Sequence, residues 1–208
     1  RVAGKNNETQ PVAEAPAVDE PWHLSAWTEA EQQVLFDALE RRGITGDVLR
    51  GHQPGLWRIE YALEGYPGVT AIIPTGGKLH LLRPCLDDLL NKTNYPNFEI
   101  MLVDNSNDDG VERLVAELSE HHDNIRRIVD TRKTFNYSAL INTAIPHTST
   151  PFLLMLNDDI TVIEPDWLAT MVEQAQRPEV GIVGAKLLYP DDTIQHAGVV
   201  LGPYCGAV

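Results

Sequence analysis

The stretch Pro151–Asp159, Pro-Phe-Leu-Leu-Met-Leu-Asn-Asp-Asp, decides how the rest of the chain is interpreted. Its apolar run, Phe152–Leu156, has no alternation, which is typical of a strand buried on both faces of a parallel sheet. Asn157, Asp158 and Asp159 follow at the strand end, where open α/β sheets bind their ligands. Adjacent carboxylates repel each other, and a divalent cation with oxygen ligands would relieve that repulsion. The alternative is a plain Asn-Asp-Asp turn, because these residues favour turns.

The composition describes an acidic chain of globular type. It has 208 residues, a formal net charge of −14 and a hydrophobic content of 43%, which suits one core with an appendage. Binding a phosphate backbone needs a basic surface, so nucleic-acid binding is excluded as the main role. Binding of a small phosphorylated ligand remains possible, because an acidic protein can hold a nucleotide through a metal ion and backbone amides. The two cysteines, Cys85 and Cys205, form no metal or disulfide motif, which favours a reducing compartment. No apolar stretch is long enough to span a bilayer.

The pattern along the chain predicts a tail, a lead-in and one α/β domain. Residues 1–21, rich in Ala, Pro, Glu and Asn, predict a disordered tail. Residues 22–68 predict a lead-in with one helix, capped by Thr28 and Glu31, and an extended segment with alternating apolar residues. Residues 69–208 alternate apolar runs with helical spacings, which predicts βαβ units and a mainly parallel sheet flanked by helices.

Within the α/β domain the patterns place individual elements. The expected strands are 69–74, 98–103, 125–129, 152–156, 180–188 and a last one from Gln195. The expected helices are 79–90, 112–118, 138–145 with Asn136 as its cap, and one that starts at Pro165 and runs to about Gln176. Met101 and Met155 lie within strand runs and are expected in the core.

Polar residues follow three of these strands directly. Right-handed crossovers bring the carboxyl ends of the first, second and fourth strands to one edge of the sheet. Thr75, Asp104 and the Asp158–Asp159 pair are therefore expected to share one crevice.

Several blocks of the sequence resemble family 2 glycosyltransferases, which have the GT-A fold with a Rossmann-like sheet. The blocks are Ile-Ile-Pro-Thr at 72–75, Phe-Glu-Ile-Met-Leu-Val-Asp-Asn-Ser at 98–106, Phe-Asn-Tyr-Ser-Ala-Leu-Ile-Asn at 135–142, Leu-Asn-Asp-Asp at 156–159 and the run 181–202. The resemblance covers about Trp57 to Gly202, and the blocks look like bacterial members that build surface polysaccharides. The resemblance implies transfer of a sugar, with inversion, from a nucleotide-diphosphate donor to a saccharide or lipid-linked hydroxyl acceptor.

The resemblance also implies roles for single residues. Asp104 would contact the nucleotide base, and Asp158 would contact the ribose. Asp159 would ligate Mn²⁺ or Mg²⁺. The whole nucleotide-binding set implied in this way is Pro74, Thr75, Asp104, Asn157 and Asp158.

Three features depart from the family pattern. The turn after Pro-Thr is Gly76–Lys78, where the family usually has Arg-Asp or similar, and Ile141 stands where a basic residue often precedes Asn142. Family members also continue further, so the resemblance places the catalytic base beyond Val208. The chain is accordingly expected to be a C-terminally truncated fragment that holds the donor half of the site and transfers sugar slowly by itself.

Other readings stay open at this point. His196, in a Gln-His-Ala-Gly block, is a secondary candidate for the site, with a hydrogen-bonded structural histidine as its alternative. Asp191 and Asp192 follow Tyr-Pro and indicate a turn. The alternative function is a nucleotide-sugar-binding module without catalysis, and a third is a sugar-nucleotide pyrophosphorylase, for which Gly76–Lys78 is a poor phosphate loop. No Gly-x-Gly-x-x-Gly follows a strand, which argues against a Rossmann dehydrogenase. The expected location is cytoplasmic, with the inner face of the membrane as an alternative for a full-length protein.

Overall fold

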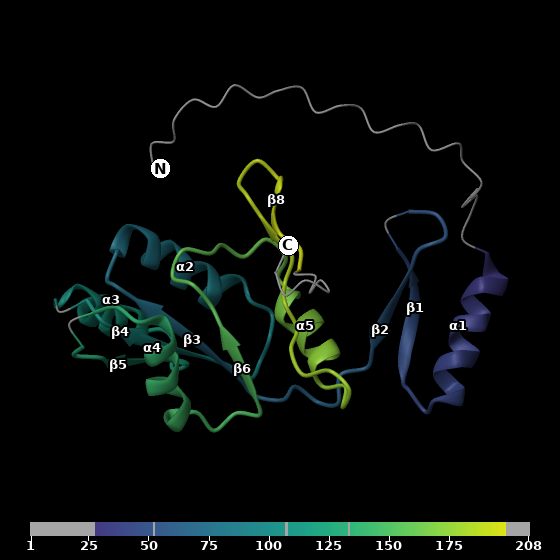
Figure 1. Cartoon of the computed structure of the whole chain (residues 1–208), viewed down its shortest axis with the longest axis horizontal. Coiled ribbons are helices and arrows are strands. Elements are labelled where there is room, and N and C mark those ends of the chain that lie inside the picture. Colours follow the sequence, from purple (N-terminus) through teal and green to yellow (C-terminus); the bar gives the residue numbers. More distant parts are fainter. Residues whose placement is uncertain (1–27, 52, 107, 133, 199–208) are drawn as a thin grey trace, which may run out of the picture.

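The computed structural model describes residues 28–51, 53–106, 108–132 and 134–198 (Figure 1). The expected tail and Cys205 lie outside these residues. The described elements are, in chain order, α1 (Glu29–Arg41), β1 (Gly46–Arg50), β2 (Trp57–Tyr61), β3 (Val69–Thr75), α2 (Leu79–Lys92), β4 (Phe98–Asp104), α3 (Gly110–Ser119), β5 (Ile125–Val129), α4 (Tyr137–Ala144), a 3₁₀ turn (Ile145–His147), β6 (Phe152–Met155), α5 (Trp167–Ala175), β7 (Leu187–Leu188) and β8 (Ile194–His196).

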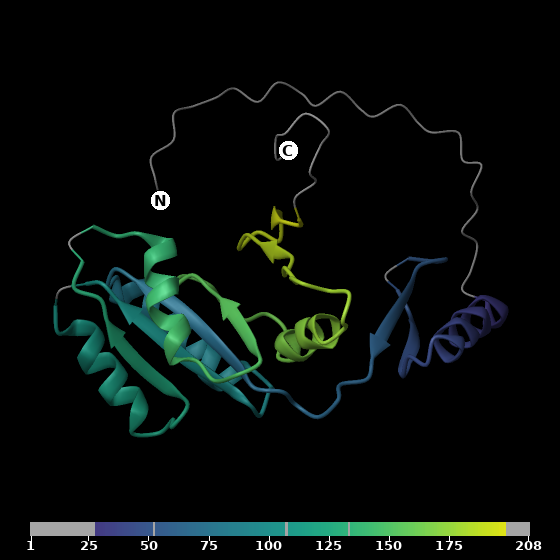
Figure 2. The same ribbon diagram turned by 60° about the horizontal axis from the view of Figure 1, so that its bottom comes forward.

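A parallel sheet with the strand order β5-β4-β3-β6 forms the centre of the fold. The larger core cluster lies on the sheet face covered by α2, α3 and α5, and a smaller cluster lies beneath α4 on the other face. Figure 2 shows α3 and α4 on opposite sides of the sheet. The expected α/β architecture, with a mainly parallel sheet flanked by helices, is therefore confirmed.

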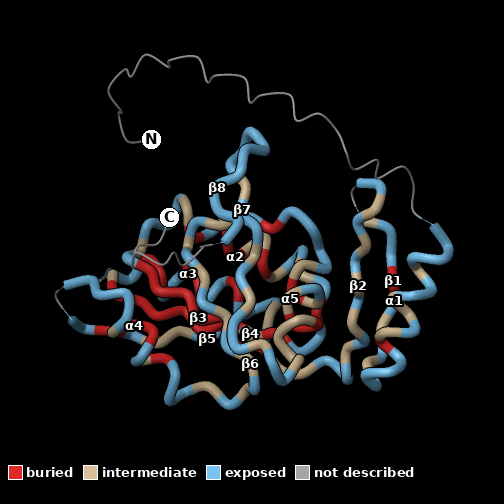
Figure 3. The backbone as a smooth tube through the Cα atoms, turned by 45° about the vertical axis from the view of Figure 1, so that its right-hand side comes forward, coloured by how far each residue is buried: buried red, intermediate tan, exposed pale blue. Residues whose placement is uncertain are grey.

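Burial within the sheet is uneven. Every residue of β3 is buried (Figure 3), as its mainly apolar run predicts. Met101 of β4 also lies in the core. The expectation that the run 152–156 is buried on both faces is wrong, since Leu153 is 40% and Met155 59% exposed. The physical reason is that β6 stands at the edge of the sheet, since it pairs only with β3 among the described strands. Helix α4 packs on β3 and β4 and leaves that face of β6 uncovered. Met155 is accordingly not a core residue.

The lead-in folds as a helix and a hairpin. The predicted capping box is present, with the Glu31 backbone N–H donating to the Thr28 hydroxyl at 3.1 Å and the Glu31 carboxylate accepting from the Thr28 N–H at 3.0 Å. Antiparallel pairing joins β1 to β2. The hairpin lies beside α5 (Figure 1). Just after that helix, the Arg177 guanidinium sits 4.4 Å from the centre of the Tyr61 ring of β2. This contact attaches the lead-in to the α/β domain.

Two expectations in the C-terminal third are wrong. Helix α5 starts at Trp167 rather than at Pro165, since the Pro165 carbonyl accepts from the Asn94 N–H at 2.9 Å and stands outside the helix. The run 180–188 forms a strand only at Leu187–Leu188, and Ile182 is 93% exposed. An apolar run becomes a strand only where a neighbouring strand offers hydrogen bonds, and here β8 offers them over a very short stretch. Of the last expected strand, the structure describes Ile194–His196, and residues 199–208 lie outside the described part.

In the part of the chain that the structure describes, every helix is too short or too polar to cross a lipid bilayer.

Candidate functional site

The carboxyl ends of the central strands form one polar edge. In the parallel register Thr75 of β3 lies opposite Asp104 of β4, and the Asp130 N–H donates to the Asp104 carbonyl at 2.8 Å. After β5 the chain returns past β3 to form β6, so the strand order reverses between β3 and β6. Open α/β sheets bind ligands at such a reversal, because the loops leaving the two strands diverge there.

A direct side-chain contact joins the two strand ends at the reversal. The Thr75 hydroxyl donates to the Asp158 carboxylate, with 2.6 Å between Oγ1 and Oδ2, and accepts from the Gly77 N–H at 3.0 Å. Thr75 is fully buried and Asp158 half-buried. Since both functions of the hydroxyl are used inside the protein, Thr75 orients Asp158 and also holds the start of the loop that follows β3.

The loop after β3 depends on a glycine. Gly77 has φ +82°, and a Cβ there would collide with the side chain of Ser106. Only glycine combines this backbone conformation with such a close approach. The loops after β3 and β4 therefore pack directly against each other beside the polar edge.

Asp104 is a buried, paired carboxylate. It is 3% exposed, and its Oδ1 accepts from the Ser106 N–H at 2.8 Å while its Oδ2 accepts from Arg127 at 2.9 Å. Arg127 comes from the middle of β5 and also pairs with Glu112 of α3 at 2.6 Å. Sequence patterns missed Arg127, because its partner lies on another strand. The only available signal was the arginine pair Arg126–Arg127 inside the expected strand 125–129.

A second buried acid stands beside Asp104. Asp130 is 5% exposed and accepts from the Arg132 N–H at 2.9 Å, and the Arg132 guanidinium approaches its other oxygen at 3.3 Å. The Asn105 amide donates to the Asp130 and Arg132 carbonyls at 3.1 and 2.8 Å. These contacts tie the loop after β5 to the end of β4, and sequence patterns did not point to them.

Asn157 and Asp159 leave their side chains exposed on either side of Asp158. Among the described residues no group of three or more His, Cys, Asp or Glu side chains forms a ready-made metal cage. Mg²⁺ is commonly held by one or two carboxylates together with substrate phosphates and water. The exposed Asp159 carboxylate beside Asp158 fits this shared kind of site, in which the ligand completes the coordination.

Among the described residues, the remaining candidates make no hydrogen bond or ion pair with the polar side chains of this edge. His196 is exposed on β8 opposite Leu187, and its side chain makes no hydrogen bond or ion pair with any described residue. Asp191 accepts from the Thr193 N–H and hydroxyl, and the hydroxyl bond lowers the pKa of Asp191. These bonds confirm the expected turn at Asp191 and Asp192.

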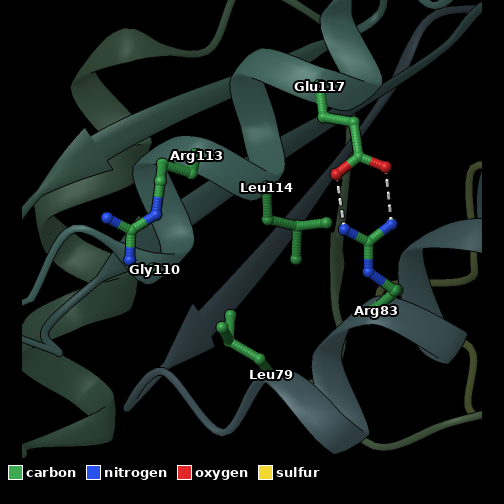
Figure 4. A pocket seen from close by; sticks show the side chains of 6 residues that line it. All are labelled: Leu79, Arg83, Gly110, Arg113, Leu114 and Glu117. Atoms are coloured by element: carbon green, nitrogen blue, oxygen red, sulfur yellow. Dashed lines mark hydrogen bonds and ion pairs between the residues drawn. The ribbon is translucent and has the colours of Figure 1, made fainter.

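An open hollow of about 310 Å³ lies between α2 and α3, floored by Leu79 and Leu114 (Figure 4). On its rim the Arg83 guanidinium makes two hydrogen bonds to the Glu117 carboxylate, at 2.9 and 2.5 Å. Because the N–H groups along one edge of the Arg83 guanidinium are already bonded to a carboxylate, this hollow is a weaker ligand site than the strand edge.

Comparison with known proteins agrees with the geometry. The chain is 42% identical over 175 residues to the uncharacterised protein y4gI of Sinorhizobium fredii and 41% identical over 179 residues to the O-antigen biosynthesis protein RfbC of Myxococcus xanthus. These matches cover 84% and 86% of this chain but only 19% and 14% of the relatives. The chain thus spans a small part of the length of the curated relatives it matches.

A solved structure and a family model complete the comparison. The mannosyltransferase PcManGT of Pyrobaculum calidifontis, solved with GDP-Man and Mn²⁺, superposes with a TM-score of 0.55 at 27% identity, over 62% of this chain and 38% of that one. The expected GT-A fold class is thereby confirmed. The model described as glycosyl transferase family 2 matches residues 70–200, from the second residue of β3 to beyond β8. This chain belongs to glycosyl transferase family 2.

Proposed function

We propose that this chain supplies the donor-binding side of a glycosyltransferase that moves a sugar from a nucleoside diphosphate to a hydroxyl acceptor in cell-surface polysaccharide synthesis. The similarity to the O-antigen biosynthesis protein RfbC supports the polysaccharide context. The similarity to a mannosyltransferase solved with GDP-Man and Mn²⁺ supports a nucleotide sugar and a divalent metal as ligands.

One observation carries the proposal: the bond from Thr75 to Asp158 joins the ends of β3 and β6 at the reversal of strand order, with Asp104 on the neighbouring strand. In this proposal Asp104 lies at the nucleotide base and Asp158 at the ribose. The rest of the proposed nucleotide-binding surface is Pro74, Thr75 and Asn157.

Asp159 is the proposed ligand of Mn²⁺ or Mg²⁺. When bound, such an ion supplies charge neutralisation for the diphosphate that leaves the sugar. The residues of this chain contribute placement, since Thr75 orients Asp158 in the loop after β6 and leaves the neighbouring Asp159 exposed. We further propose that the acceptor hydroxyl attacks opposite the leaving diphosphate, which inverts the anomeric carbon.

Calorimetry tests the donor site. Wild type is expected to bind UDP or GDP in the presence of Mn²⁺, and Asp159→Asn to bind at least about tenfold more weakly, the effect of losing a contact of about 1.5 kcal/mol to a charged group. Asp123→Asn is the matched control, because Asp123 is an exposed acid just before β5, at the opposite edge of the sheet. Equal metal-dependent affinities in wild type and Asp159→Asn would remove the proposed metal role.

Turnover separates transfer from simple binding. A transferase releases the nucleoside diphosphate from UDP-GlcNAc or GDP-mannose faster when a saccharide acceptor is added. A non-catalytic binding module binds the same nucleotides but shows no dependence of release on the acceptor.

A further inference from the structure

The loop that carries the proposed donor carboxylates has little regular structure of its own. The last ladder bond of β6 runs from the Leu156 N–H to the Ile72 carbonyl, and the next helix begins only at Trp167. Between them lie Asp158 and Asp159. A loop of this kind keeps its shape only if neighbouring elements hold its backbone.

Helix α2 provides two such contacts. The Cys85 thiol donates to the Asn157 carbonyl at 3.8 Å, and the Val162 N–H donates to the Asp88 carboxylate at 3.2 Å. Cys85 and Asp88 are three positions apart, so they lie on the same face of α2. Their two partners lie on either side of the acidic pair, so α2 holds the loop before and after Asp158 and Asp159.

Cys85 is suited to donate in this position. It is 1% exposed, and the backbone N–H of Ile160 acts on its sulfur in the direction that lowers the thiol pKa, against the larger effect of burial. Burial raises the pKa of the Cys85 thiol to about 11, and the nearby carboxylates of Asp158 and Asp159 act in the same direction. The thiol is therefore neutral at physiological pH and keeps its proton for the Asn157 carbonyl.

Asp88 is itself held in place. The Lys92 ammonium, one helical turn further along α2, lies 2.8 Å from one Asp88 oxygen, and the Val162 N–H binds the other. The side chain of Asp88 is only 18% exposed. Neighbouring Asp87 makes no side-chain hydrogen bond with any described residue of the loop, so it offers a matched comparison on the same helix.

We propose that Cys85 and Asp88 are positioning residues that set the conformation of the loop Asn157–Val162 and thereby place Asp158 and Asp159 for a metal-bound nucleoside diphosphate. This inference rests on the proposed function for the identity of the ligand. It goes beyond that function by assigning the geometry of the acidic turn to a helix outside it. Thr75 holds one side chain of the turn, and α2 holds its backbone.

Two measurements on the full 208-residue chain test the inference. Hydrogen exchange at the Ile160 and Val162 amides reports on the loop directly, without any ligand. Calorimetry with Mn²⁺ and UDP or GDP reports on placement of the carboxylates. For Asp88→Ala we expect faster exchange at Val162 and an affinity roughly five- to tenfold weaker, the loss that follows from one hydrogen bond. Cys85→Val removes both the donor to the Asn157 carbonyl and the sulfur that faces the Ile160 N–H, so it is expected to speed exchange at Ile160 and to weaken binding in the same way.

Conservative variants separate positioning from general damage to the fold. Asp88→Asn keeps an oxygen that accepts from the Val162 N–H, and Cys85→Ser keeps a donor, so both are expected to retain most of the affinity and the protection. Asp87→Ala removes the same charge without a loop contact and is expected to behave as wild type in both measurements.

The inference is overturned if Asp88→Ala and Cys85→Val leave exchange at Val162 and Ile160 unchanged, or if exchange rises while the affinity stays that of wild type. It is also overturned if Asp87→Ala weakens binding as much as Asp88→Ala does. A wild-type chain that binds neither nucleotide with Mn²⁺ overturns the proposed function instead, and the exchange data then decide separately whether α2 holds the loop.

Discussion

Replacing Thr75 by valine removes a single hydroxyl at the centre of the proposed site and leaves the shape of the side chain unchanged. That hydroxyl makes one bond to a charged group, Asp158, and accepts one from the Gly77 N–H. A hydrogen bond to a charged group contributes about 1.5–3 kcal/mol, and one between neutral groups about 0.5–1.5 kcal/mol. Asp158 is only half-buried, so water replaces part of the loss there. The free energy of unfolding is expected to fall by about 1–2 kcal/mol.

Thr75→Ser is the matched comparison. It keeps the hydroxyl but removes a buried methyl group, which costs about 1 kcal/mol. The two variants are therefore expected to be similarly destabilised in urea titrations. They are expected to differ in binding, since only valine frees Asp158 to turn away from the ligand.

Calorimetry with Mn²⁺ and UDP or GDP completes the assay. Thr75→Val is expected to bind roughly five- to tenfold more weakly than wild type, and Thr75→Ser to bind nearly as well as wild type. If valine binds like wild type, or if serine loses as much affinity as valine, the claim that the hydroxyl orients Asp158 is refuted.

Three further predictions concern stability. Met101→Ala is expected to lower the free energy of unfolding by about 2–5 kcal/mol and Met155→Ala by less than about 1 kcal/mol, because the first side chain is fully buried and the second is 59% exposed. Denaturant titration compares the two variants, and equal losses of stability would contradict the edge position of β6. Arg127→Met is expected to lower the free energy of unfolding by about 3 kcal/mol, because it leaves the Asp104 charge buried without its cation; an unchanged denaturation midpoint would show that the pair is not needed. Burial raises the pKa of Glu173, so the folded state favours the protonated carboxyl over the ionised one. The stability that this preference contributes is fully present below the unfolded pKa and is lost as pH rises through the folded pKa. Glu173→Gln is therefore expected to gain stability over wild type near pH 7 and to lose that advantage below about pH 4, as unfolding curves at several pH values will show; a constant difference would contradict the pKa direction.

The sequence by itself determined the local elements of the fold. Apolar runs marked β3 and β4, and the short pattern Ile125–Val129 marked β5. Side-chain caps marked the helix starts at Thr28 and Asn136, where the Asn136 side-chain oxygen Oδ1 accepts from the Ala139 N–H. It also determined that polar residues follow the strands directly, so a parallel sheet had to gather Thr75 and Asp104 at one edge. These features depend on neighbours along the chain, which is why periodicity and capping patterns reveal them.

The tertiary structure alone decided which strand stands at the edge and which partners hold the site. The apolar run 152–156 predicts a fully buried strand, yet Leu153 and Met155 are exposed because α4 packs over β3 and β4. Arg127 meets Asp104, and Asp88 meets Val162, across long separations in sequence. Local sequence patterns do not predict such pairings, because burial and ion pairing depend on elements that come together only when the chain folds.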